Sequence, residues 1–241
     1  MTDKPVQRLR IRFAKGHPVR WIGHLDVARF WERALRRAEI PVLYSQGFNP
    51  QPKMQFASAL PVGASGRAEL MDIWVAPPQD PTDVARRLQA QCPPGFDILD
   101  VWEVPLEWPS LQSQVREAIY HVQLERQFLP PDWRAQLDAF LAAEEVWQER
   151  RRKKKWVRYN LRPLVLDLRV LQEDDDWVTL YLRVQSTPGA TGRPDELLKA
   201  LGWQDVPRRI ERERIVLANE EGEPIGEPSS PAPPAAEAVS S

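Results

Sequence analysis

Cysteine and histidine are both scarce in this chain. It has one cysteine, Cys92, and three scattered histidines, His17, His24 and His121. A single cysteine excludes a disulfide within the chain, a cysteine-based zinc site and a cysteine-held iron–sulfur cluster. The histidines also do not show the paired spacing of a transition-metal site. We therefore expect no metal, no cofactor and a reducing compartment.

Long apolar runs are also missing. No uninterrupted apolar segment approaches the roughly 20 residues that a helix needs to span a bilayer. Residues 1–20 interleave charges throughout, which does not fit the apolar core of a secretory signal. The sequence therefore predicts a cytoplasmic protein without a membrane partner.

The net charge of −1 is small but unevenly distributed. Residues 1–53 contain eleven lysines and arginines against four acidic residues. A local excess of one sign is a guide to partners, whereas the overall balance is not. A basic N-terminal face is therefore the first surface to consider for binding.

The 241 residues include 42% hydrophobic side chains and ten tryptophans, enough for substantial cores. Composition breaks near Pro105–Pro109 and again near Ala218, where a glutamate-rich and proline-rich segment begins. We predict four parts: an N-terminal unit with a basic face over residues 6–106, a linker over 107–116, a C-terminal unit over 117–217 and a disordered tail over 218–241.

Hydrophobic periodicity predicts the same order of elements in both units. In the first, residues 8–13 alternate as a strand, 24–38 show helical spacing, and Asp80 and Pro81 are typical of a helix start. Further strands are expected at 42–45, 54–60, 68–75 and 96–104. The second unit has expected strands at 118–124, 146–150, 164–171, 177–184 and 210–217, with helices at 133–141 and 194–201. This order fits an α+β fold of two tandem ferredoxin-like β-α-β-β-α-β units with antiparallel sheets.

Two basic segments are candidates for nucleic-acid binding. The first is the strand over residues 8–13, whose alternation places Arg8, Arg10 and Arg12 on one face. The second is the run Arg150–Lys155, with Arg151, Arg152, Lys153 and Lys154, which is followed by Trp156, Arg158 and Tyr159. Charge combined with aromatic planes suits single-stranded nucleic acid. A hairpin tip made basic for solubility is the alternative for the second segment.

A ligand site is expected near the first helix. His24 and Asp26 begin the helix, and Arg29 and Arg33 recur along one of its faces, where a merely solvated surface is the alternative. The proline-rich loop that follows presents Phe48, Asn49 and Lys53. Packing and loop-crossover roles for these residues remain open.

Residues 20–66 also carry a dense set of motifs. They include Gly23-His24-Leu25-Asp26, Tyr44-Ser45-Gln46-Gly47-Phe48-Asn49-Pro50-Gln51-Pro52-Lys53 and Ala59-Leu60-Pro61-Val62-Gly63. With Asn160-Leu161-Arg162-Pro163 and Arg193-Pro194-Asp195-Glu196-Leu197-Leu198, the pattern resembles the bacterial radical-SAM-linked protein family over residues 7–217. Members are found beside, or fused to, B12-binding radical SAM proteins. Gly23, Gln51 and Asn160 depart from the family's usual Ser, His and Asp.

The resemblance implies a radical SAM enzyme as partner on a separate chain, which would bring the iron–sulfur cluster and cobalamin. Together with the basic segments, it predicts a non-catalytic accessory module that binds RNA or an RNA–protein substrate. One alternative is a metal-independent RNA-processing nuclease with His24 as general acid or base. The other is a protein–protein adaptor that docks through its tryptophan-rich surfaces.

Overall fold

A computed structural model describes residues 5–152, 155–219 and 225, which form a mixed α/β protein with a mostly antiparallel sheet. The first half contains β1 (Gln7–Lys15), α1 (His24–Arg37), β2 (Met54–Phe56), β3 (Ala64–Val75), α2 (Pro81–Gln89) and β4 (Phe96–Val104). A short 3-10 turn, His17–Val19, follows β1. The connection to the second half contains the single-turn helix α3 (Leu111–Gln114).

The second half begins with β5 (Val115–Glu125), a 3-10 turn at Arg126–Phe128 and α4 (Trp133–Ala142). A hairpin follows, made of β6 (Trp147–Arg152) and β7 (Lys155–Asn160), and then a 3-10 turn at Arg162–Leu164. β8 (Val165–Glu173), β9 (Trp177–Gln185), α5 (Pro194–Ala200) and β10 (Arg208–Leu217) complete this half.

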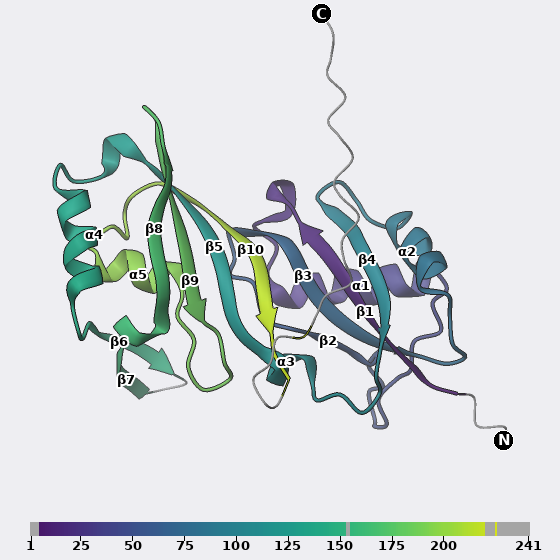
Figure 1. Cartoon of the computed structure of the whole chain (residues 1–241). Helices are drawn as coiled ribbons and strands as arrows, with labels where there is room; N and C mark the ends of the chain where they lie inside the picture. Colours follow the sequence, from purple (N-terminus) through teal and green to yellow (C-terminus); the bar gives the residue numbers. More distant parts are fainter. Residues whose placement is uncertain (1–4, 153–154, 220–224, 226–241) are drawn as a thin grey trace, which may run out of the picture.

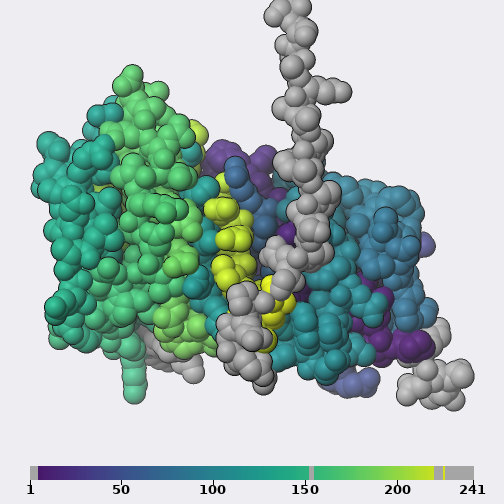
Figure 2. Space-filling model, viewed as in Figure 1, coloured from purple at the N-terminus to yellow at the C-terminus, as the bar shows by residue number. Residues whose placement is uncertain are grey.

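In the described part of the chain the main strands form one eight-stranded sheet in the order β4-β1-β3-β10-β5-β9-β8, with β2 also paired to β3. The two halves meet where β10 runs parallel to β3 over Ala64–Gly66. Figure 1 shows this continuous sheet, and Figure 2 shows β10, in yellow, between the halves. The antiparallel sheets predicted for the two halves are thus joined into one, because the last strand of the second half also pairs with the first half.

The two larger hydrophobic cores, one in each half, lie on the same face of this sheet. Phe13 faces α1 and pairs with Glu69, and a bulge places Gly66 opposite Lys15 on that face. Gly66 pairs with Arg212 of β10, which pairs with Tyr120 in the second core. Residues opposite each other in a ladder share a face. The helices α1, α2, α4 and α5 therefore cover one side of the sheet, and α1 and α5 pass behind the strands in Figure 1.

Local sequence explains most element boundaries. Asp80 caps α2, since its carboxylate accepts a 2.8 Å hydrogen bond from the Thr82 amide, and Pro81 takes the first helical position. The predicted strands at 8–13 and 96–104 and the helices at 24–38 and 133–141 are confirmed within a residue or two. Gly202, which has a positive φ of 77°, follows the end of α5.

Three predicted strands differ. Residues 42–45 make only isolated bridges, since Pro41, Pro50 and Pro52 have no amide proton to donate to a ladder. The strand predicted at 54–60 ends at Phe56, because β10 occupies the next stretch of the same edge of β3. The strand predicted at 146–150 belongs to the two-stranded β6–β7 sheet, outside the main one.

The predicted tail over 218–241 falls almost wholly outside the described residues. Its first residue, Ala218, is buried, and the Ala218 amide donates to the Gln114 carbonyl at 2.9 Å. The predicted boundaries at 106, 117 and 217 stay predictions.

Candidate nucleic-acid interface

The strand arginines of β1 are buried. Arg8 and Arg10 are each 1% exposed, and both bind the carboxylate of Asp72 on β3, at 2.6 Å and 2.7 Å. The connection after β4 covers them, because the carbonyls of Trp108 and Pro109 accept hydrogen bonds from Arg8 at 2.7 Å and 3.0 Å. These arginines therefore do not form the open basic face that the sequence predicts, and their binding of nucleic acid stays a prediction.

Arg12 follows the same pattern. It is also buried, and its guanidinium lies 3.2 Å from Asp100 on β4. Trp74, Trp108 and Trp102 lie beside the guanidinium groups of Arg8, Arg10 and Arg12 respectively, 5.0–5.8 Å from the ring centres. Carboxylates and aromatic faces thus neutralise and cover this row of charge.

At the start of α1, His24 is exposed, and its ring meets Phe56 edge to face at 5.2 Å. Asp26 forms an exposed ion pair with Arg29 at 3.0 Å, and Arg33 is exposed further along the helix. The nearby Arg20 donates to the ring nitrogen of His17. The charged groups around His24 therefore engage one another rather than converging on its ring.

A small cavity of about 20 Å³ lies beneath His24 and is also lined by Lys15, Ser58 and Glu69. This volume is enough for one water molecule and too small for a substrate. Burial lowers the pKa of Lys15, although Glu69 acts in the opposite direction. Lys15 donates hydrogen bonds to the carbonyls of Arg20 and Ala64, which gives it a structural role.

The proline-rich loop after α1 is exposed over residues 44–51. Phe48 is fully exposed and Asn49 is exposed beside it. Lys53 places its ammonium 4.6 Å from the ring centre of Trp74, on the opposite face of the sheet from α1. The structure therefore does not join Lys53 to His24 in one ligand site.

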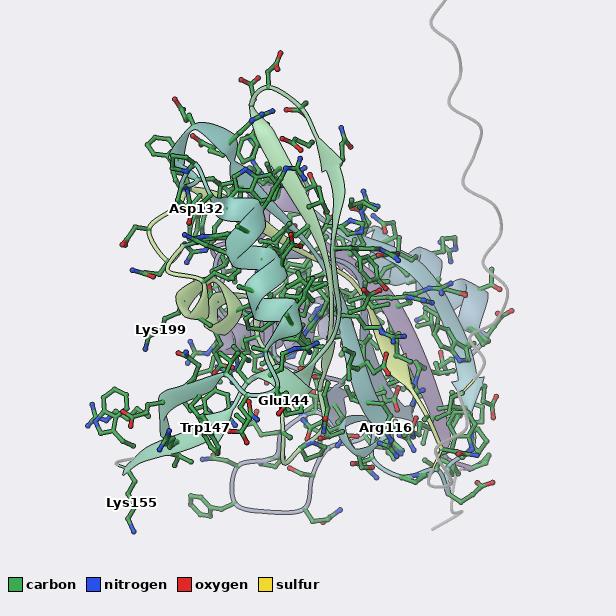
Figure 3. The ribbon with its side chains drawn as sticks, turned by 60° about the vertical axis from the view of Figure 1, so that its left-hand side comes forward. Arg116, Asp132, Glu144, Trp147, Lys155 and Lys199 are labelled. Atoms are coloured by element: carbon green, nitrogen blue, oxygen red, sulfur yellow. The ribbon has the colours of Figure 1, made fainter. Side chains whose placement is uncertain are left out.

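The β6–β7 hairpin places basic and aromatic side chains together on the surface. Register puts Trp147, Arg151, Trp156 and Arg158 on one of its faces. Trp147 and Trp156 are 47% and 68% exposed, and the Arg158 guanidinium lies 4.6 Å from the Trp147 ring centre. Figure 3 shows the hairpin projecting from the body, with the Lys155 side chain pointing outward. Lys153, Lys154 and the side chain of Arg152 lie outside what the structure describes.

A pocket of about 220 Å³ lies beside this hairpin. Arg150 and Arg151 line it from β6, and Arg193 and Glu196 line it from the start of α5. Arg150 lies 3.6 Å from Glu196 and also covers the Tyr159 ring at 4.6 Å. Burial, and then Glu196, raise the pKa of Tyr159. Charged side chains from the hairpin and from the main body therefore line this pocket together, and Arg150 and Glu196 link the two parts.

The sequence indicated part of this surface. Arg151 and Trp156 were expected from the basic run, whereas Trp147, Arg193 and Glu196 were not. Alternation along each strand, combined with the pairing of Arg152 with Lys155, puts Trp147 on the face of Trp156, and alternation alone does not fix that pairing. No local signal brings Arg193 to Arg150, since the chain between them includes two strands of the main sheet.

Two general findings bear on function. Across the described residues, no three His, Cys, Asp or Glu side chains are grouped so that they could hold a metal ion. The helices among these residues are all too short or too polar to cross a membrane.

Fold and surface together define a mixed α/β protein with a projecting basic and aromatic hairpin. The chain belongs to the bacterial family described as "uncharacterized protein conserved in bacteria (DUF2344)", whose model matches residues 8–194. This match confirms the broader part of the resemblance, namely that the chain belongs to a bacterial protein family. Among curated proteins, no sequence match is found.

Solved structures give distant likenesses. A chain from a "Cbf5-Nop10-Gar1 complex" is 13% identical with a TM-score of 0.46, and the match covers 86% of this chain and 48% of that one. A chain from an "archaeal box H/ACA sRNP Nop10-Cbf5 complex" is 14% identical with a TM-score of 0.43, covering 86% and 47%. This chain thus spans about half the length of either.

Proposed function

We propose that the protein binds single-stranded RNA through the β6–β7 hairpin. The observation that carries the proposal is that one face of the hairpin presents two exposed tryptophans, Trp147 and Trp156, together with two arginines, Arg151 and Arg158. Residues 147–160 contain seven basic residues and one acidic residue, a formal charge of +6. Such a strip can follow a phosphate backbone while bases stack on the indole rings.

Burial of the β1 arginines strengthens the case for the hairpin. Solvent-facing charge must be available to a phosphate, and Arg8 and Arg10 already hold Asp72 inside the protein. Arg151 and Lys155 are exposed. RNA affinity should therefore depend on the hairpin and be insensitive to β1.

Binding of a short labelled single-stranded RNA, followed by fluorescence anisotropy, tests this function. Trp156→Ala is expected to weaken binding about tenfold, because stacking contributes about 1–3 kcal/mol per base. Trp21→Ala is the matched control, since Trp21 is 66% exposed but precedes α1, in the half of the chain that does not contain the hairpin. Equal affinity of the Trp156 variant and the native protein would contradict the proposal.

We also propose that the protein serves a radical SAM enzyme as a non-catalytic accessory module. Support comes from the sequence resemblance and from the absence, across the described residues, of a grouped set of metal ligands. The partner would bring its own cluster and cobalamin. Affinity capture of the tagged full chain, with and without RNase, should retain an iron–sulfur protein identified by its visible absorbance and by mass spectrometry.

Retention that survives RNase would favour direct docking, the adaptor alternative, and loss on RNase treatment would favour an RNA bridge. The nuclease alternative gains no support from the site. Arg20 and Arg29, the arginines nearest to His24 in sequence, bind His17 and Asp26.

At the level of fold, we propose that both halves are ferredoxin-like units. The first half has the order β4-β1-β3-β2 and the second β10-β5-β9-β8, each antiparallel throughout. Numbered within each half, both orders are 4-1-3-2, as a split β-α-β plan requires. The β6–β7 hairpin is then an insertion between the first helix and second strand of the second unit.

A further inference from the structure

The pocket beside the hairpin is built by two segments far apart in sequence. β6 supplies Arg150 and Arg151, and the turn before α5 supplies Pro188, Gly189, Thr191 and Arg193. Hydrogen bonds hold this turn in shape: the Thr187 hydroxyl donates to the Ala190 carbonyl at 3.1 Å, and the Thr191 hydroxyl donates to the Thr187 carbonyl at 3.0 Å. A preformed wall loses little entropy when a ligand binds.

The charges around the pocket do not cancel. Three arginines face one carboxylate, so the formal balance is 3 − 1 = +2. Glu196 lies next to Arg150, at 3.6 Å, and Arg150 also donates to the Thr191 carbonyl at 3.3 Å. Arg150 is thus held by protein groups, and Arg151 and Arg193 supply the positive charge open to a ligand.

A phosphate monoester carries a charge of about −1.5 to −2 at neutral pH, and its three terminal oxygens accept strong hydrogen bonds from arginine. An internal phosphodiester carries one negative charge and has two free oxygens. A pocket with a balance of +2 therefore matches a monoester better than a diester.

We infer that this pocket binds a terminal phosphate monoester of an RNA strand, with Arg151 and Arg193 on its oxygens. The inference rests on the proposed RNA-binding function and specifies its ligand. The adjacent hairpin face carries Trp147 and Trp156, so nucleotides next to the phosphorylated end have aromatic surfaces to stack on. The protein would then recognise processed RNA ends rather than internal sequence.

Three RNAs of one sequence test the inference on the full chain: one with a 5′-phosphate, one with a 3′-phosphate and one with hydroxyls at both ends. One phosphorylated form should bind about tenfold more tightly than the hydroxyl form, as expected for added charge-assisted hydrogen bonds. Arg193→Gln should remove this preference, so that the phosphorylated and hydroxyl RNAs bind this variant with equal affinity. Lys199→Gln, which removes a charge from the exposed end of the same helix, should keep the preference (Figure 3).

Arg193→Lys tests whether the effect of Arg193→Gln comes from lost charge or from a disturbed fold. It keeps a cation at the same exposed position, so it should retain part of the preference for the phosphorylated RNA. Inorganic phosphate and a nucleoside monophosphate serve as competitors to distinguish a small-molecule ligand from an RNA end. Strong competition by either, without a preference among the RNAs, overturns the inference.

The outcomes separate the two proposals. Equal binding of all three RNAs overturns the terminal-phosphate inference and leaves the RNA-binding function standing. Failure of every RNA to bind overturns both. Loss of the preference in Lys199→Gln as well as in Arg193→Gln would reduce the effect to general charge and also overturn the inference.

Discussion

Asp72 holds two arginines inside the sheet. Its carboxylate, which is fully buried, binds Arg8 and Arg10, and the second arginine also donates to the Gln114 side chain at 3.1 Å. Two buried cations around one anion leave a net positive charge, which the carbonyls of Trp108 and Pro109 help to offset. Each group is thus stable only while the others are present.

Asp72→Asn is expected to reduce the free energy of unfolding by about 3–5 kcal/mol, because loss of one member leaves buried charges without a counter-ion. Chemical denaturation measures this loss. Asp83→Asn is the control: its ion pairs with Arg86 and Arg87 lie at the surface, where solvent screens such pairs and they stabilise the fold little. Similar small losses in both variants would show that the arginines find other acceptors.

Cys92 makes a pH-dependent contribution. Burial, and then Asp97, raise the pKa of its thiol from 9.0 to about 11, while Arg37 acts in the opposite direction. Between these two values the unfolded chain has released the proton and the folded protein still holds it. Stability from this residue is therefore present below pH 9 and is lost as the pH rises toward 11.

In Cys92→Ala this contribution disappears. The difference in unfolding free energy between the native protein and the variant should shrink as the pH rises from 9 to 11. Urea denaturation at several pH values measures it, and taking the difference removes other titrating groups such as Lys15. A difference that stays constant with pH would show that the folded thiol titrates normally.

At the scale of elements, the β6–β7 hairpin is anchored at its base by Asn160. The Asn160 side-chain oxygen accepts hydrogen bonds from the amides of Val146, at 2.9 Å, and Arg162, at 3.1 Å. The Leu161 amide also donates to the Val146 carbonyl at 2.8 Å. The position where the resembling family has Asp thus serves to close the hairpin, a role that an amide oxygen fulfils as well as a carboxylate.

Salt dependence reports how many phosphates the hairpin contacts. Arg151→Gln and Arg158→Gln together should reduce the slope of log affinity against log salt by about 1.4, since each contact with a single strand contributes roughly 0.7. Titrations of RNA at several salt concentrations measure the slope. Arg29, Arg33 and Arg36 on α1 provide a triple Gln control that should leave it unchanged. An unchanged slope in the hairpin variant would make the hairpin a solubility feature.

At the scale of the whole molecule, the joint between the halves is narrow. β3 and β10 pair over three residues, and behind them Arg212 binds Glu69 in a buried ion pair. Although burial opposes its charge, Glu69 and Tyr120 raise the pKa of Arg212. Arg212 also donates to the carbonyl of Ser58 at 3.1 Å, so one side chain connects β10, β3 and the loop before β3.

Arg212→Ala should uncouple the two halves, because it leaves Glu69 as an uncompensated buried charge in the joint. Calorimetry should show one unfolding transition for the native protein and two for the variant, as separate cores begin to unfold independently. Arg214→Ala, at an exposed position on the same strand, is the control and should keep one transition. A single lowered transition in Arg212→Ala would show that the rest of the sheet couples the halves.

Local sequence by itself determined most of the main strands and helices and the inward side of several of them. Alternation at Leu9, Ile11 and Phe13 and helical spacing at Trp31, Leu35 and Ala38 are short-range patterns, and these residues are buried. Leu25, which the same helical spacing placed on the inward face, is exposed instead. The basic and aromatic composition of residues 150–159 likewise indicated the hairpin surface.

Only the tertiary structure decided whether the polar face of a strand meets solvent. Arg8 and Arg10 look like surface residues until Asp72, more than sixty positions away, is placed opposite them and residues 108–114 cover them. The same holds for Arg193 beside Arg150 and for β10 beside β3. A residue's pattern of neighbours sets which way its side chain points, whereas distant segments, brought close by the chain's topology, set what it meets there.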